Sequence, residues 1–441
     1  MVERLLLLII STLLIYHRTT SYGYLIDDIE VATHPQPKEW WKKLWYQVMG
    51  HSYFNATTEH TITLLIHTVN VCLVYLALGQ NWVSFVAAML FAVNPVNTQA
   101  SVWLSGKVYS LAATAILIGI WIKPLFPLMY FLGYYLSLNA FLTPLLFLFL
   151  TPVWFVVLPI FLTLVYKKRI VGEPKRRFEG STKWMQEISF RKLIISVKTF
   201  GYYFRMCLFP TKLGMCHQYL HVFGLSKSET EKWYTLDKYF WLGLSVLMTT
   251  LVGVVLKWNI FGLVWFTILM PQWCNFIVLN HPICERYAYL ANIGLMYFVA
   301  TVLLKIPYGQ YVLVALGSYY ATRLWYFLPA YKTNRDFFSS NIDNFDQVAI
   351  GWNQKGLELI RFGRPGDALD TMMEGLMYRP QDFRLNYNSA NLLNGMGRCH
   401  EAIQFLKKAE AVLDPNNNYQ MWRTNIDHMK ATMRTRGVMI E

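Results

Sequence analysis

Two adjacent aspartates, Asp27 and Asp28, follow the first apolar run of the chain and are its first candidates for chemistry. They come directly after Tyr24, Leu25 and Ile26, where a membrane segment would leave the bilayer. A carboxylate at such a boundary can accept a proton from a hydroxyl group, and carboxylates that face a membrane cavity are usually functional. The alternative is that both aspartates are solvated or cap a short helix, and position alone favours neither interpretation.

The composition predicts a membrane body that positions this pair. Of the 441 residues, 55% are hydrophobic and 16% aromatic, and the apolar residues occur in blocks. A block of about 20 apolar residues crosses the hydrocarbon core as a helix, because lipid cannot pair backbone polar groups. We therefore expect an all-α polytopic bundle of about eleven spans: 3–20, 60–79, 82–101, 107–122, 124–138, 140–166, 192–210, 239–256, 259–279, 286–304 and 309–328.

The charge distribution predicts which side each loop occupies. The net charge is +14, and nine Lys or Arg lie between 167 and 192, so the charge follows the loops and is not typical of nucleic-acid binding. Basic loops beside spans are cytoplasmic. The N-terminus is then cytoplasmic, whereas the 21–59 loop and the C-terminal region lie outside, in the periplasm, the endoplasmic reticulum lumen or an organelle equivalent.

The C-terminal region, 331–441, has a different pattern from the membrane body, 1–330. Small, apolar and terminating residues recur about every 34 positions, which is typical of tetratricopeptide repeats. We expect repeats at about 349–382 and 383–415, followed by a capping helix at 419–433. The pattern predicts the fold of 349–433 and does not identify its ligand, and we expect this arm to dock on the last span or on a partner subunit.

No metal site is expected from the sequence. His217 and His221 have the i, i+4 spacing of two ligands on one helix face, but no third ligand accompanies them. The inside of the second span also carries His67 and Asn70, for which we favour hydrogen bonds to another helix over catalysis.

Four segments resemble, in order, the motifs of one membrane enzyme family, the transmembrane and tetratricopeptide-repeat (TMTC) protein O-mannosyltransferases with a GT-C fold. They are Leu25-Ile26-Asp27-Asp28, His67-Thr68-Val69-Asn70-Val71, the pair Phe91–Gln99 and Trp103–Lys107, and Glu285-Arg286-Tyr287-Ala288-Tyr289-Leu290. With the repeats, the likeness covers nearly the whole chain. It implies a GT-C-like membrane domain that moves a hexose, with mannose the expected sugar, from a polyprenyl- or dolichyl-phosphate carrier to a protein hydroxyl on the outer or lumenal side.

The resemblance also implies roles for particular residues. Asp27 or Asp28 is the base, and Arg286 with Lys107 binds the donor phosphate, although span-end cations also simply reach lipid headgroups. The supporting residues are Glu285, Tyr287, Tyr289, Asn94, Asn97 and Gln99. No cofactor is expected beyond the lipid-phosphate sugar, which is the donor substrate, and the partners are this lipid, membrane lipids and the acceptor protein, not nucleic acid.

Three positions depart from the family pattern and leave a second interpretation open. Asn94, Asn97 and Gln99 stand where the family has two histidines and an acid. Amides keep the hydrogen bonds but cannot transfer protons or bind a metal in the same way. The alternative is therefore a catalytically inactive scaffold, derived from a GT-C enzyme, that docks partners through its repeats.

Overall fold

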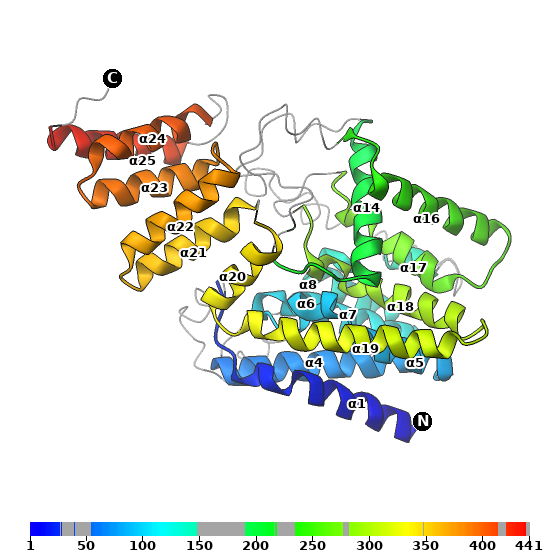
Figure 1. Ribbon diagram of the computed structural model, residues 1–441. Helices are drawn as coiled ribbons and strands as arrows, with labels where there is room; N and C mark the ends of the chain where they lie inside the picture. Colours follow the sequence, from blue (N-terminus) through cyan, green and yellow to red (C-terminus); the bar gives the residue numbers. More distant parts are fainter. Residues whose placement is uncertain are drawn as a thin grey trace.

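The computed structural model describes residues 1–26, 28, 39, 54–147, 190–215, 217, 234–276, 282–346, 348–412 and 420–437 (Figure 1). Every regular element in these ranges is a helix and none is a strand, which confirms the all-α class. Asp27, most of the predicted span 140–166 and the basic loop up to residue 189 lie outside the described residues.

The membrane body consists of helices of unequal length joined by short 3-10 turns. Its α-helices are α1 (Val2–Tyr16), α4 (Ala56–Ala77), α5 (Trp82–Val93), α6 (Thr98–Ser101), α7 (Lys107–Trp121), α8 (Phe126–Leu136), α9 (Pro144–Phe147), α14 (Lys192–Leu208), α16 (Lys238–Val255), α17 (Phe261–Leu269), α18 (Tyr289–Leu303) and α19 (Gly309–Phe327). The turns that matter below are η2 (Pro95–Asn97), η3 (Leu104–Gly106), η5 (Leu138–Ala140), η8 (Pro271–Trp273) and η9 (Glu285–Ala288).

Three of the described helices are long and apolar enough to cross a membrane. They are Ala56–Ala77, Leu104–Trp121 and Lys238–Val255, and the bent pair Trp82–Val93 and Pro95–Ser101 adds a fourth if it is one span. Side chains fix where they begin: Asn55 accepts from the N–H of Thr58, and Asp237 accepts from two backbone N–H groups of α16. The bundle of about eleven spans remains a prediction beyond these.

The predicted span 82–101 is not one continuous helix but is bent by 59° after α5. Proline has no N–H to continue the helix, and Pro95 occupies the first position after the break. The Asn94 side chain accepts from the N–H of Val96 at 3.0 Å and so satisfies one of the freed groups. After the bend, η2 and α6 both contact η9.

Close backbone contacts hold α14 and α16 together. A Cβ on Gly201 of α14 would lie 2.1 Å from the Tyr239 carbonyl oxygen of α16, and one on Gly243 would lie 2.1 Å from that of Val197. Glycine at both positions lets the two backbones touch, as small residues do between membrane helices. Either alanine would push the helices apart.

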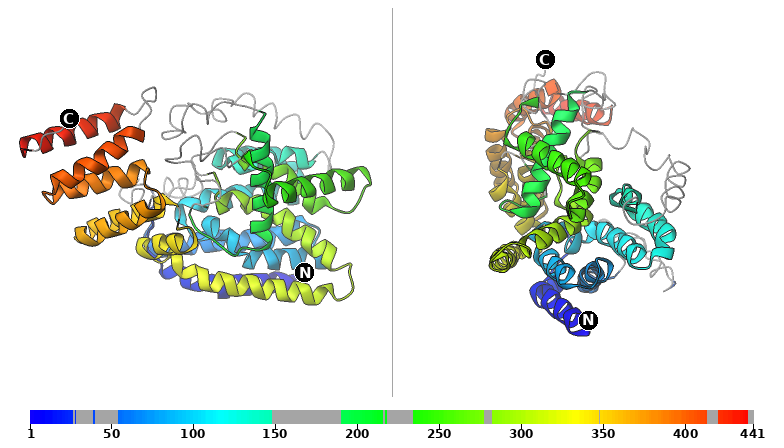
Figure 2. Two further views of the ribbon diagram at one scale, coloured as in Figure 1. Left: turned by 45° about the horizontal axis from the view of Figure 1, so that its top comes forward. Right: turned by 90° about the vertical axis from the view of Figure 1, so that its right-hand side faces the viewer.

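Several chain segments meet at one end of the bundle. α1, α4, α5 and α19 lie side by side, and the last turn of α19 is next to the end of α1 (Figures 1 and 2). The N–H of Gly23 donates to the Lys332 carbonyl oxygen at 3.2 Å, and His60 of α4 lies 3.1 Å from the Gly23 carbonyl oxygen. This end also carries the C-terminal helices.

Among the described residues after Tyr331, six helices form an arm beyond this end: α20 (Asn334–Asn344), α21 (Ala349–Arg361), α22 (Pro365–Tyr378), α23 (Phe383–Gly395), α24 (Cys399–Val412) and α25 (Gln420–Thr435). Small residues allow the close pairing of α21 with α22, because a Cβ on Gly375 would lie 2.6 Å from the Trp352 side chain. The left-handed Gly363 (φ +70°) and Gly397 (φ +79°) end α21 and α23. The two helix pairs fall within the predicted repeats, and their assignment as tetratricopeptide repeats remains a prediction.

Candidate functional site

Five of the ten predicted site residues meet at the end of the bundle where the arm begins: Asp28, Gln99, Glu285, Arg286 and Tyr287. The loop after α1, the bent 95–106 segment and η9 bring their polar side chains together there. Asp28 and Arg286 are 258 positions apart in the sequence, yet both contact the 103–105 turn. The site therefore depends on the bend at Pro95.

Asp28 is buried and firmly held. Its Oδ1 accepts from the backbone N–H of Ser105 at 2.8 Å and from the Ser105 hydroxyl at 2.5 Å, while its Oδ2 accepts from the N–H of Leu25 at 3.1 Å. Only 2% of its surface is exposed. These bonds fix the first loop against the turn before α7. Asp27, the other predicted acid, lies outside the described residues.

Lys107, a predicted phosphate ligand, has a carboxylate partner inside the protein. Its Nζ lies 2.9 Å from Glu59 Oε2, and neither side chain has any exposed surface. The other oxygen of Glu59 accepts from the N–H of Phe54 at 2.9 Å. The pair therefore ties the start of α4 to the start of α7.

Arg286, the other predicted phosphate ligand, is only half-buried and is surrounded by aromatic rings. Its guanidinium carbon lies 5.1 Å from the Trp103 ring, 5.3 Å from the Tyr287 ring and 5.9 Å from the Tyr109 ring. Its Nη1 donates to Gln99 Oε1 at 3.1 Å. Aromatic faces and a neutral amide contact the cation directly, while the carboxylate of the neighbouring Glu285, which pairs with His217, also interacts with it electrostatically.

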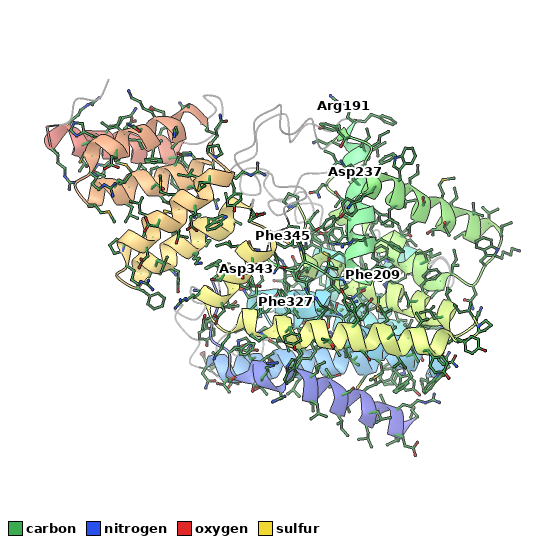
Figure 3. The ribbon with its side chains drawn as sticks, viewed as in Figure 1. Arg191, Phe209, Asp237, Phe327, Asp343 and Phe345 are labelled. Carbon is green, nitrogen blue, oxygen red and sulfur yellow. The ribbon has the colours of Figure 1, made fainter. Side chains whose placement is uncertain are left out.

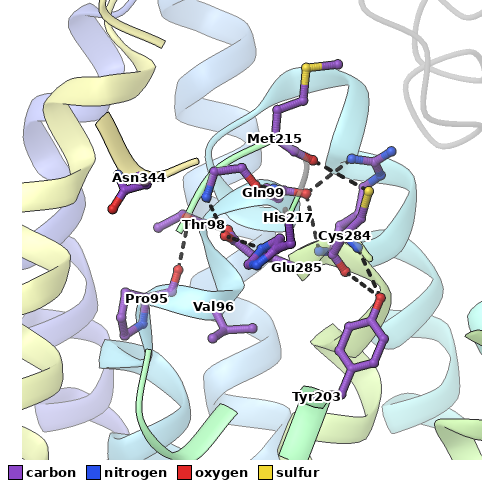
Figure 4. Close-up of polar contacts among 12 residues, drawn as sticks. Pro95, Val96, Thr98, Gln99, Tyr203, Met215, His217, Cys284, Glu285 and Asn344 are labelled. Atoms are coloured by element: carbon purple, nitrogen blue, oxygen red, sulfur yellow. Dashed lines mark hydrogen bonds and ion pairs between the residues drawn. The ribbon is translucent and has the colours of Figure 1, made fainter. Parts of the chain in front are cut away.

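Gln99 is oriented by a ring of hydrogen bonds (Figure 4). Its Nε2 donates to the Gly214 carbonyl oxygen at 2.7 Å, which leaves Oε1 as the atom that faces Arg286. The N–H of Gly214 donates to Glu285 Oε1 at 2.7 Å, so one short segment connects both predicted site residues. Gln99 thus acts as a neutral acceptor where an acid would have formed an ion pair.

Glu285 forms a buried pair with His217, whose Nε2 lies 3.2 Å from Glu285 Oε1. Burial raises the pKa of Glu285, while His217, the N–H of Gly214 and Arg286 act in the opposite direction. The His217 ring lies 4.6 Å from that of Phe345, which follows α20 at the junction of the arm and the bundle (Figure 3). The residue that follows α20 therefore packs against His217, which in turn pairs with the site residue Glu285.

Asn94 and Asn97 lie in the fold near the bend and not around Arg286. Asn94 Nδ2 donates to the Cys207 carbonyl oxygen at 2.9 Å, and Asn97 Nδ2 donates to that of Phe91 at 2.7 Å. Asn97 Oδ1 accepts from Asn292 of α18 at 3.2 Å. Both predicted supporting residues thus hold the broken helix in place.

Tyr289 faces the inside of the bundle and meets the polar residues of the second span. Its hydroxyl lies 2.7 Å from His67 Nδ1 and accepts from Asn70 Nδ2 at 3.1 Å. The prediction that His67 and Asn70 bind another helix is confirmed by these contacts. Tyr287, two residues earlier, lies instead against the Arg286 cation.

Sequence reasoning identified Tyr287 but assigned no role to Glu59 or Ser105, or to the rings of Trp103 and Tyr109 beside Arg286. An acidic residue in the first turn of an apolar span was the available signal for Glu59, because buried charges are normally paired. Ser105 and Trp103 belong to a segment noted only for its resemblance. His217 was weighed as a metal ligand, whereas it pairs with Glu285.

Within the described residues no group of three or more His, Cys, Asp or Glu could hold a metal ion. No family model, curated protein or solved structure matches the chain. Function must therefore be argued from the arrangement of the side chains.

Proposed function

We propose that the chain is a membrane glycosyltransferase that moves a hexose from a polyprenyl- or dolichyl-phosphate carrier to a protein hydroxyl on the outer or lumenal side. The observation that carries this proposal is the half-buried Arg286 on η9, a cation held by aromatic rings and by the neutral amide of Gln99. One of these rings, Trp103, belongs to the turn that also fixes Asp28. Such a cation binds a lipid phosphate and stabilises it as a leaving group. Mannose remains the sugar that the family resemblance favours.

In the proposed reaction the bond between hexose C1 and the phosphate oxygen breaks, and the lipid phosphate leaves with the electron pair. A bond forms between C1 and the acceptor oxygen on the opposite face, which inverts the configuration. The acceptor proton passes to a carboxylate. Because at least three of the roughly four lone-pair sites of Asp28 already accept hydrogen bonds, we assign the base to Asp27 and propose that Asp28 orients the loop.

Lys107 has a different role in this proposal from the one that the sequence predicted. Its ammonium group is fully buried against Glu59, so we propose that it positions the turn and does not bind the donor phosphate. The arm of α20–α25 would present the acceptor or a partner, since it begins beside the Asp28 loop.

A second candidate, an inactive scaffold of GT-C origin, is favoured by a specific observation. Asn94 and Asn97, which replace titratable family residues, make only bonds that support the fold among the contacts described above. In this case the arm would dock partners while the membrane body provides an anchor.

Transfer assays with single variants separate the two candidates. Purified protein in lipid would receive radiolabelled polyprenyl-phosphate hexoses and a denatured protein extract. We expect transfer by the parent, its loss in Asp27→Asn and Arg286→Ala, and parent-like transfer by Arg361→Ala, which changes an exposed arginine of the arm. A folded parent that transfers no hexose from any donor would favour the scaffold.

A further inference from the structure

Three polar side-chain atoms, on residues that connect to Arg286 through their contacts, are buried without a hydrogen-bond partner. They are Asn139 Oδ1 on η5, and Gln272 Oε1 and Trp273 Nε1 on η8. Asn139 is 1% exposed and Trp273 is 5% exposed. Buried polar side-chain atoms nearly always have a partner, so three such atoms on connected residues indicate a missing ligand or missing water.

A chain of contacts connects the three residues to Arg286 and to its neighbour Tyr287. Asn139 Nδ2 donates to the Arg286 carbonyl oxygen at 3.4 Å, and Gln272 Nε2 donates to the Asn139 carbonyl oxygen at 3.2 Å. Trp273 stacks on the ring of Tyr287, with the ring centres 4.1 Å apart and the planes 12° from parallel. Asn139 thus contacts Arg286 itself, whereas Gln272 and Trp273 contact residues that do.

The existing bonds determine what the free atoms can do. The amide nitrogens of Asn139 and Gln272 both donate to carbonyl oxygens, so the free end of each side chain is the oxygen, an acceptor. The indole N–H of Trp273 is a donor only. A matching ligand must therefore offer at least two donors and one acceptor, as neighbouring hydroxyl groups do. A phosphodiester has no donor and does not match.

We propose that Asn139, Gln272 and Trp273 bind the hexose hydroxyls of the lipid-linked donor beside the phosphate at Arg286. This inference rests on the proposed function and adds the residues that distinguish a sugar-bearing lipid from the bare lipid phosphate. A site that hydrogen-bonds a hydroxyl disfavours an analogue that lacks it, because its buried polar groups then stay unpaired.

The test measures binding of two lipids by the full chain in nanodiscs, polyprenyl phosphate and polyprenyl-phosphate mannose. The main variant is Trp273→Phe, which removes the N–H but keeps a ring to stack on Tyr287. Asn139→Ala is the second variant, and Gln354→Ala on α21 is the control. One net hydrogen bond corresponds to an affinity change of about 3- to 10-fold. We expect Trp273→Phe and Asn139→Ala to bind the mannose lipid that much more weakly and to bind polyprenyl phosphate within about 2-fold of the parent.

The possible results separate this inference from the proposed function. Equal weakening for both lipids, or no change in either, would overturn the sugar subsite and assign the three atoms to structural water only. A parent that binds neither lipid, with Arg286→Ala no different, would instead overturn the proposed function on which the subsite rests. A loss confined to the mannose lipid supports both.

Discussion

The buried ion pair between Lys107 and Glu59 should be among the strongest single links in the membrane body. At 2.9 Å and an effective dielectric constant of about 20, the two charges attract each other by about 6 kcal/mol. Removing one partner leaves the other charge buried, which typically costs about 3–5 kcal/mol. Lys107→Met should cost more than Glu59→Gln, because Asp28 also lies close enough to interact electrostatically with the ammonium group.

A double-mutant cycle measures this link. The two single variants and Lys107→Met/Glu59→Gln would be unfolded in bicelles by titration with SDS. We expect the double variant to be destabilised by less than the sum of the single variants, with a coupling energy of about 3 kcal/mol. This difference is expected because one unpaired buried charge destabilises the folded protein more than two buried neutral groups do.

The arm provides a matched control pair. Lys430 Nζ lies 2.7 Å from Glu410 Oε2, which is closer than in the buried pair, but these side chains are 18% and 45% exposed. An exposed pair couples by roughly 0.2–1 kcal/mol. If the Lys107–Glu59 coupling energy were no larger than that of Lys430–Glu410, burial would not strengthen the pair and the reasoning would be refuted.

Three further changes test other parts of the site and the arm. Gln99→Glu places a carboxylate where Oε1 lies 3.1 Å from Arg286 and should weaken polyprenyl phosphate binding about 10-fold, equivalent to one charge-assisted hydrogen bond; unchanged affinity would mean that Arg286 is not the anion ligand. Gly106→Ala places a Cβ 1.8 Å from the Gln99 carbonyl oxygen and should destabilise the protein by about 3 kcal/mol in the SDS titration, whereas Gly395→Ala, with no atom within 4 Å, should be nearly neutral. Burial raises the pKa of Asp382, so the stability that this residue contributes is present below its unfolded pKa of about 4 and is lost as the pH rises through the folded pKa. Hydrogen exchange of α23, corrected for intrinsic rates, should therefore show the parent losing protection relative to Asp382→Asn as the pH rises, and a constant difference would argue against a buried charge.

The apolar pattern of the sequence predicted where several helices lie, because a buried or lipid-facing helix requires apolar side chains along its length. The predicted spans 60–79 and 239–256 correspond to α4 (Ala56–Ala77) and α16 (Lys238–Val255). The difference at α4 is local: Asn55 caps the helix, so it begins in a polar stretch that hydropathy does not assign to a span. Hydropathy also did not predict the 59° bend, although Pro95 was visible in the sequence.

The site could be predicted only as a set of motifs. The contact between Gln99 and Arg286 joins residues 187 positions apart, and the one between Asp28 and Ser105 joins residues 77 positions apart. No periodicity within a segment determines such pairs, because they depend on how whole helices pack. For the same reason the partner of Lys107 was not foreseen, and Glu59 was not among the predicted site residues.

The hydrogen bond from the N–H of Ile26 to Asn334 Oδ1 has a consequence for the time course of synthesis. It joins residues 308 positions apart. A ribosome that adds about 5–20 residues per second needs roughly 15–60 seconds to make Asn334 after Ile26. The segment that carries Ile26 and Asp28 therefore waits for Asn334 until α19 has been made, and this end of the protein closes only after nearly the whole helical bundle has been synthesised.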